Sequence, residues 1–202
     1  MAYAQEEDNV NLQQYLFPDF SRSVVKMKNG RTSNVMLNYN RISEKMVFEQ
    51  RGEYFNLVNP ETVDTIYLHN RPFIMQGKCF LEIVSEGKYP FYIQYRGELR
   101  APPRPAAYGT TSELTSSNYL SGINTNEGYF NFKLPEGYKV INSAIYWVMI
   151  DGEMKSFIGE KQFLRLFPGE APRLKKYIKD SKLKLDKTED FLRLVKYCNS
   201  EL

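Results

Sequence analysis

Short apolar runs separated by turn residues fill the chain from Ser23 to Leu99. Glycine, proline or asparagine stands between most neighbouring runs. Strands at such spacing are typical of a barrel or a sandwich, so this part of the chain is predicted to be mostly antiparallel β-structure. The expected strands cover residues 24–28, 31–39, 45–50, 54–58, 65–68, 73–76, 79–85 and 90–99.

Two dipeptides, Asn29-Gly30 and Asp151-Gly152, each stand between two apolar runs. They favour a type I′ turn, in which both central residues take a positive φ, so each predicts a β-hairpin. The run at 90–99 has apolar residues on both of its faces. This pattern indicates a strand in the centre of the sheet.

The segment 100–128 interrupts the apolar periodicity with three prolines, three glycines and eight serines or threonines. Such a composition is typical of a linker or a long loop. The expected organisation is therefore an extended arm at 1–20, a β-domain at 21–99, this linker, and a β-hairpin with a helical region at 129–202. Whether the second half forms its own domain or completes the first sheet is left open.

After Gly159 the apolar spacing changes to that of short helices. Thr188 is the expected N-cap of the last one. The fold class is therefore α+β: an antiparallel β-barrel or sandwich, then a hairpin and a C-terminal cluster of three short helices. Their apolar stripes are Phe163, Leu164 and Phe167; Leu174, Tyr177 and Ile178; and Phe191, Leu194, Val195 and Cys198.

The net charge of +3 is unevenly distributed. Residues 160–202 contain 11 Lys or Arg and 7 Asp or Glu, a balance of +4, whereas the remaining residues carry −1. Basic residues opposite the second helical stripe are a possible contact surface for nucleic acid, for anionic surface polymers or for lipid headgroups. A solvated helix face is the favoured interpretation. These residues are Arg173, Lys175, Lys176 and Lys179.

The first residues favour export from the cytoplasm. Ala2-Tyr3-Ala4 has the small-x-small form that signal peptidase recognises, and acidic residues follow it. Met1 is therefore expected to stand near the mature end of a trimmed precursor, and an in-frame apolar leader upstream would test this. The periplasm or the cell surface is the predicted location. No apolar run approaches the roughly 20 residues that cross a bilayer, so no membrane span is expected.

Catalytic and metal-binding motifs are scarce. His69 is the one histidine and falls in an expected surface turn, while Cys79 and Cys198 are more simply read as separate apolar residues than as a disulfide. One histidine and two distant cysteines do not make a standard zinc site, and no phosphate-binding glycine loop is present. The sequence therefore predicts no catalytic residue, cofactor or metal. A catalytic pair of carboxylates remains an open alternative, and its candidate residues are Glu49, Glu53, Glu82 and Glu98.

Two tyrosines in the polar segment, Tyr108 and Tyr119, are expected to make exposed contacts. Two longer stretches carry a resemblance. They run from Tyr15-Leu16-Phe17-Pro18 to Asn38-Tyr39-Asn40, and from Phe163 to Phe191. Together they resemble an uncharacterised family of exported β-rich proteins from Bacteroidetes, a likeness that supports export and implies no activity.

A second likeness concerns Val24 to Gly30, followed by a long strand and Met46-Val47-Phe48. It is similar to the first motif of Sm-like small barrels that bind RNA. The glycine expected in the second strand is missing around Ser33-Asn34, and His69-Asn70-Arg71 matches the second motif only loosely. The likeness is therefore used as an indication of fold.

The sequence thus predicts an exported, non-catalytic binding or structural protein of the bacterial cell envelope, with a protein or glycan partner. The first alternative is a hydrolase of envelope or dietary polymers that uses paired carboxylates. The second is a small-barrel protein that binds nucleic acid.

Overall fold

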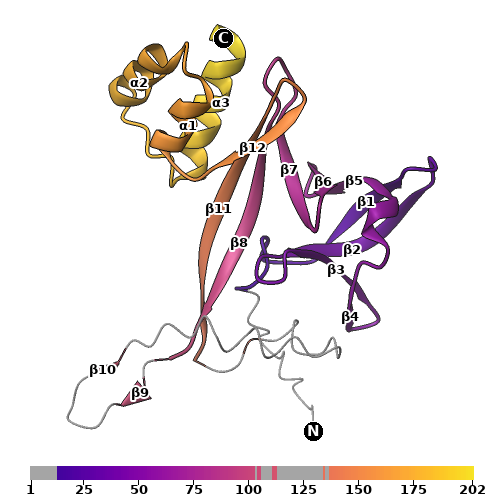
Figure 1. Ribbon diagram of the computed structural model, residues 1–202. Helices are drawn as coiled ribbons and strands as arrows, with labels where there is room; N and C mark the ends of the chain where they lie inside the picture. Colours follow the sequence, from indigo (N-terminus) through magenta and orange to yellow (C-terminus); the bar gives the residue numbers. More distant parts are fainter. Residues whose placement is uncertain (1–12, 103, 106–110, 113–133, 135–136) are drawn as a thin grey trace, which may run out of the picture.

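The computed structural model describes residues 13–102, 104–105, 111–112, 134 and 137–202 (Figure 1). In these residues an antiparallel sheet of ten strands is followed by three C-terminal helices, and two short strands pair separately. The predicted α+β class is confirmed. The strand order across the large sheet is β12-β11-β8-β7-β6-β5-β1-β2-β3-β4. None of the described helices is long and apolar enough to span a membrane.

The bounds of the elements follow the predicted runs closely, most shifting by two residues or fewer. The strands are β1 (Ser21–Met27), β2 (Thr32–Asn40), β3 (Lys45–Gln50), β4 (Glu53–Asn56), β5 (Val63–Leu68), β6 (Arg71–Gln76), β7 (Cys79–Ser85), β8 (Phe91–Arg100), β9 (Arg104–Pro105), β10 (Thr111–Ser112), β11 (Lys139–Ile150) and β12 (Glu153–Phe157). The helices are the 3-10 turn η1 (Pro60–Thr62), α1 (Glu160–Leu166), α2 (Ala171–Asp180) and α3 (Thr188–Glu201).

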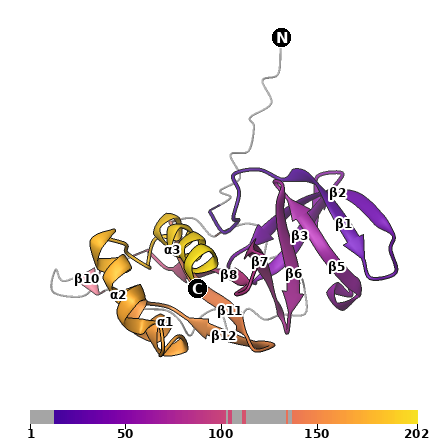
Figure 2. The same cartoon turned by 90° about the horizontal axis from the view of Figure 1, so that it is seen from above.

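Strands β1 to β7 curl into an open barrel, which is seen from above in Figure 2. The far end of β2 reaches β8, where the Tyr39 hydroxyl donates to the Tyr95 carbonyl at 2.9 Å. The Gly97 amide donates to the Arg41 carbonyl at 2.9 Å just beyond β2. The barrel is therefore brought together by strands that lie far apart in the sequence.

The described end of the N-terminal arm packs on β2. Tyr15 forms a β-bridge with Asn40, and the Leu16 amide donates to the Tyr39 carbonyl at 2.9 Å. The arm is further held by the buried Asn38, whose side-chain amide donates to two backbone carbonyls within residues 17–19. This segment is thus a fixed part of the barrel wall.

The second half of the chain completes the first sheet. β8 lies between β7 and β11, which agrees with the two apolar faces of its sequence. β11 pairs with β8 from Lys139 opposite Arg100 to Val148 opposite Phe91, a register of ten residue pairs. In Figure 1 this long pair connects the barrel to the helices. The two halves therefore share one continuous sheet.

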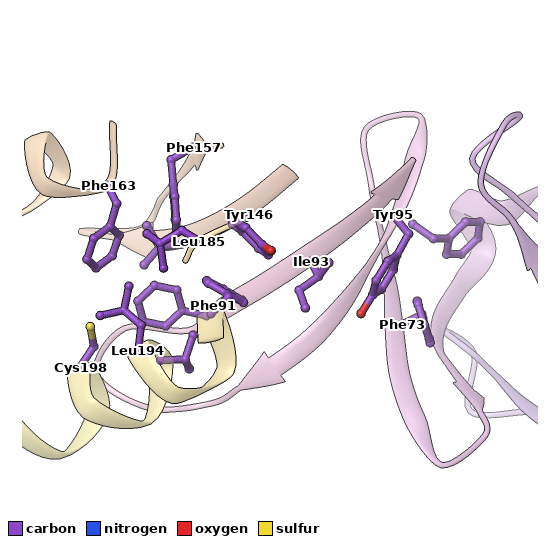
Figure 3. Packing of buried hydrophobic residues seen from close by; sticks show 14 of the residues in the cluster. Phe73, Phe91, Ile93, Tyr95, Tyr146, Phe157, Phe163, Leu185, Leu194 and Cys198 are labelled. Carbon is purple, nitrogen blue, oxygen red and sulfur yellow. The ribbon is translucent and has the colours of Figure 1, made fainter. Parts of the chain in front are cut away.

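A single core cluster runs along β8 from the barrel to the helices. Figure 3 shows Phe91 among side chains of the helical end, Tyr95 beside Phe73 at the barrel end, and Ile93 between them. At the helical end, Phe191 of α3 stacks on Tyr146 with ring centroids 3.9 Å apart. Since none of the helices is long enough to be stable alone, this packing is what holds them.

One hairpin prediction is confirmed and another is wrong in its turn type. Asp151 and Gly152 both have positive φ, 52° and 79°, in a two-residue loop. At the first hairpin only Gly30 has positive φ, and its amide donates to the Met27 carbonyl at 2.9 Å. Met27 pairs with Arg31 instead, which leaves a three-residue loop that ends in a glycine with positive φ. Such loops are the next most common hairpin connections after two-residue loops.

The predicted N-cap at Thr188 is also wrong, by one residue. Thr188 already lies inside α3, and the extended residue before it is Lys187, which makes no side-chain cap. The lysine side chain has no acceptor for a backbone amide, so the cap prediction failed because the helix starts earlier than its best capping residue. Both cysteines are free, and Cys198 is buried, which agrees with the favoured interpretation of the sequence.

Candidate functional site

The basic residues selected from the sequence lie on the solvent face of α2. All four are exposed, whereas Leu174 and Ile178 of the same helix are buried against the core. The structure therefore brings them together on one surface. They are Arg173, Lys175, Lys176 and Lys179. The other two predicted contact residues, Tyr108 and Tyr119, lie outside the described residues.

Arg173 differs from its three neighbours because its guanidinium is already bound. It forms an ion pair with the carboxylate of Glu201 and donates to the Glu201 carbonyl at 2.7 Å. It also lies over the Tyr197 ring, 5.9 Å from the centroid, and Tyr197 stacks on Tyr177 with centroids 3.7 Å apart. Arg173 thus fastens α3 to α2.

The three lysines have no anionic partner among the described residues. Lys175 and Lys179 are four residues apart and share one helix face, with Lys176 beside them. The exposed Asp180 follows directly in the sequence and pairs with none of them. Their ammonium groups are therefore available to a ligand, and we call these three residues the lysine face.

A second group of charged residues lies inside the barrel, on the neighbouring strands β6, β7 and β8. The carboxylate of Glu82 accepts two hydrogen bonds from Arg71, one of them from Nε at 2.5 Å, and a third from the Tyr95 hydroxyl at 2.7 Å. Arg71 also lies 5.0 Å from the ring centroid of Phe17. The three side chains thus form a closed network.

The electrostatics of this network favour the ion pair. Burial opposes the charge of Arg71, but the hydrogen bonds and the charge of Glu82 outweigh it and raise the pKa of the guanidinium. Burial, and then the charge of Glu82, also raises the pKa of Tyr95 well above its ordinary range. Tyr95 is therefore a neutral donor to a carboxylate that is already neutralised.

The other acids considered as a catalytic pair do not join Glu82. Glu49 accepts the Gly52 amide at 2.7 Å within the turn that follows β3. Glu53 and Glu98 are exposed, on β4 and β8. The acid inside the barrel is thus paired with a cation instead of with a second acid.

His69 occupies the predicted turn, but its ring is half-buried instead of free at the surface. Both His69 and Asn70 have positive φ, 50° and 61°, and the imidazole stacks on Phe17 with centroids 4.1 Å apart. Its Nε2 is buried and has no hydrogen-bond partner among the described residues. In the described part of the chain no hydrogen bond joins the ring to an acid or a thiol, the kind of partner that orients a catalytic histidine.

Two hollows of similar size lie on the described surface. The first, of about 440 Å³, lies between the arm, Arg41 just after β2, and strand β11. The second, of about 430 Å³, lies between the β7–β8 turn and α3. Among the described residues, no three His, Cys, Asp or Glu side chains gather so as to hold a metal ion.

Sequence reasoning missed the buried network and the first hollow. Glu82 and Tyr95 stand 11 and 24 positions after Arg71, and no sequence motif marks the three residues. The available signal was a single charged residue in each of the otherwise largely apolar strands β6 and β7, and it did not show that both charges face inward. No family model, no curated protein and no solved structure matches this chain.

Proposed function

We propose that this protein is an exported, non-catalytic binding protein of the bacterial cell envelope, and that its lysine face contacts an anionic polysaccharide. The observation that carries the proposal is the contrast on α2. Arg173 is bound within the molecule, whereas Lys175, Lys176 and Lys179 are exposed without an anionic partner among the described residues. Export rests on the Ala2-Tyr3-Ala4 pattern and on the Bacteroidetes resemblance.

The arrangement suits a flexible polyanion better than a small ligand. A lysine ammonium is a strongly hydrated point charge on a mobile side chain, so it attracts carboxylate or sulfate groups without fixing their geometry. The lysine face lies on the exposed side of α2, and none of its three residues lines either of the two hollows described above. Contact with a chain of repeated negative charges fits this exposed position.

The closed network inside the barrel supports the non-catalytic part of the proposal. A general acid or base has to exchange its proton with a substrate, which requires a titratable group that is not already bound. Glu82 is held by Arg71 and Tyr95, so the buried acid serves the structure of the barrel. The hydrolase alternative would need a second acid near it, but Glu49 accepts a hydrogen bond from the Gly52 amide, and Glu53 and Glu98 are exposed.

The test compares dextran sulfate with uncharged dextran in titration calorimetry at low salt. We expect heat with dextran sulfate alone, and a signal that fades as salt screens the contact. The variant K175Q/K176Q/K179Q should bind roughly tenfold more weakly, since each exposed lysine contributes about 0.5 kcal/mol. The control K45Q/K78Q/K139Q removes the same charge from exposed positions in β3, the β6–β7 turn and β11.

Two outcomes would overturn the proposal. One is equal weakening of dextran sulfate binding by both triple variants, which would mean that overall charge and not the lysine face is responsible. The other is equal binding of dextran sulfate and dextran by the unaltered protein. Tighter binding of single-stranded RNA than of dextran sulfate would favour the nucleic-acid alternative.

A further inference from the structure

The first hollow contains a charge that the described residues do not neutralise. Arg41 follows β2 and lines the hollow together with Phe17 of the arm and Val140 and Asn142 of β11. Its side chain is half-buried, and no described acid forms an ion pair with it. A guanidinium has five N–H donors, and one of them, on Nη2, donates to the Leu16 carbonyl at 3.0 Å.

The position of Arg41 is fixed by the backbone on both sides. Its amide donates to the Gln14 carbonyl at 2.8 Å, and its carbonyl accepts the Gly97 amide at 2.9 Å. Gly97 packs so closely that a Cβ there would lie 3.2 Å from Cβ of Arg41 and 2.8 Å from Cγ1 of Val140. The floor of the hollow is therefore rigid, which lowers the cost of ordering a bound ligand.

The surroundings favour an anion at this point. Burial lowers the pKa of Arg41 below its ordinary value; Tyr95 acts in the opposite direction, and the nearby charge of Arg71 adds to the effect of burial. Glu82 neutralises Arg71 but makes no ion pair with Arg41. A partly desolvated cation without a counter-ion is unfavourable, so a negative ligand would relieve this cost.

We propose that this hollow binds an organic carboxylate, held by the guanidinium of Arg41, with the apolar part of the ligand against Phe17 and Val140. The planar fork of an arginine matches a carboxylate with two parallel hydrogen bonds. One guanidinium balances the single charge of a carboxylate better than the larger charge of a phosphate. The volume of about 440 Å³ lies within the usual range for small-molecule sites. This site is separate from the lysine face.

The probe pair is N-acetyl-phenylalanine and its amide, which share an apolar ring and differ in the negative charge. Binding is followed by amide NMR shifts in the ¹⁵N-labelled protein, with inorganic phosphate as a third probe. The carboxylate should bind with shifts around Arg41 and Asn142, and the amide and phosphate should bind at least tenfold more weakly. The triple variant of the lysine face should bind the carboxylate as the unaltered protein does.

The variant R41Q should weaken N-acetyl-phenylalanine by roughly tenfold or more, because the charge-assisted hydrogen bonds are lost. R22Q, at an exposed arginine on the outer face of β1, is the matched control and should change nothing. Should R41Q fail to fold, R41K keeps the charge without the fork and should bind with intermediate affinity. Equal binding of acid and amide, or unchanged binding in R41Q or R41K, would overturn the proposal.

Discussion

The barrel end and the helix-covered end of the sheet share strand β8 but fill their interiors with different chemistry. Around Phe91 the helical end is an array of aromatic rings: Phe191 contacts Phe91, Tyr146 and Phe157 with centroids 6.0, 3.9 and 6.0 Å away. Around Tyr95 the barrel end contains Arg71 and Glu82. The same strand therefore passes from an apolar interior into one with paired charges.

This difference indicates how the two regions divide the work of folding. Apolar burial has no directional requirement and stabilises in proportion to area, so the helical end gains stability from packing alone. A buried ion pair costs desolvation and contributes little net stability, but removing one partner is costly. The barrel end is therefore expected to be sensitive to the loss of single charges, and the helical end to the loss of volume.

The largest expected effect is at the helical end. Phe191→Ala removes a ring that is fully buried, with 0% exposure, and leaves a cavity among three aromatic neighbours. The free energy of unfolding should fall by about 3–5 kcal/mol, as measured by urea denaturation. Leu192, its neighbour on the exposed side of α3 at 43% exposure, is the control, and Leu192→Ala should cost about 0.5 kcal/mol. Equal losses would mean that α3 does not pack as described.

The next effect is at the barrel end. Glu82→Gln keeps the shape of the side chain but leaves Arg71 as a partly buried cation without its counter-ion. We expect a loss of about 2 kcal/mol in the free energy of unfolding, less than for a fully buried pair because the Arg71 side chain is 34% exposed.

A double variant distinguishes an ion pair from simple packing. Arg71→Met together with Glu82→Leu removes both charges and keeps the volume, so it should recover most of the stability lost in Glu82→Gln. If the double variant is less stable than the single one, the network stabilises the barrel by itself, and the proposed contrast between the two regions is wrong.

The strands and helices were predictable because their signals are local. Alternation of apolar residues, Asp151-Gly152 in a two-residue turn and the stripe around Leu194 each depend on neighbours within a few positions. The curling of the barrel was not predictable. It rests on contacts such as the Tyr39 hydroxyl on the Tyr95 carbonyl, 56 positions apart, and no local pattern encodes such a distance.

The candidate sites also differ in how far the sequence could predict them. The lysine face was predictable because helical spacing places basic residues opposite an apolar stripe. The pairing of Arg173 with Glu201, 28 positions away, was not predictable, because it depends on how α2 and α3 meet. Arg41 was missed because its isolation is a property of its surroundings in space: the sequence does not show which acids lie within reach of a given arginine.

The smallest expected effect concerns the two thiols, one at each end of the molecule. Cys198 is fully buried in α3, and burial raises the pKa of its thiol from 9.0 to about 12. The folded protein keeps the proton that the unfolded chain loses, so this contribution to stability is complete below pH 9 and is lost between pH 9 and 12. At pH 10, one unit above the pKa of the unfolded thiol, the loss should be about 1.4 kcal/mol.

Urea denaturation at pH 7.5 and pH 10 tests this contribution by comparing the unaltered protein with Cys198→Ala. The variant should lose about 1.4 kcal/mol less between the two pH values, because it has no thiol to ionise. Burial also raises the pKa of Tyr39 and Tyr95. Both tyrosines titrate equally in the two proteins, so their contributions cancel in the difference. Cys79→Ala, at a half-buried position in the barrel, should change the pH dependence less. An equal effect of both substitutions would show that the barrel end excludes water as fully as the helical end, and the contrast between the two interiors would then rest on the ion pair alone.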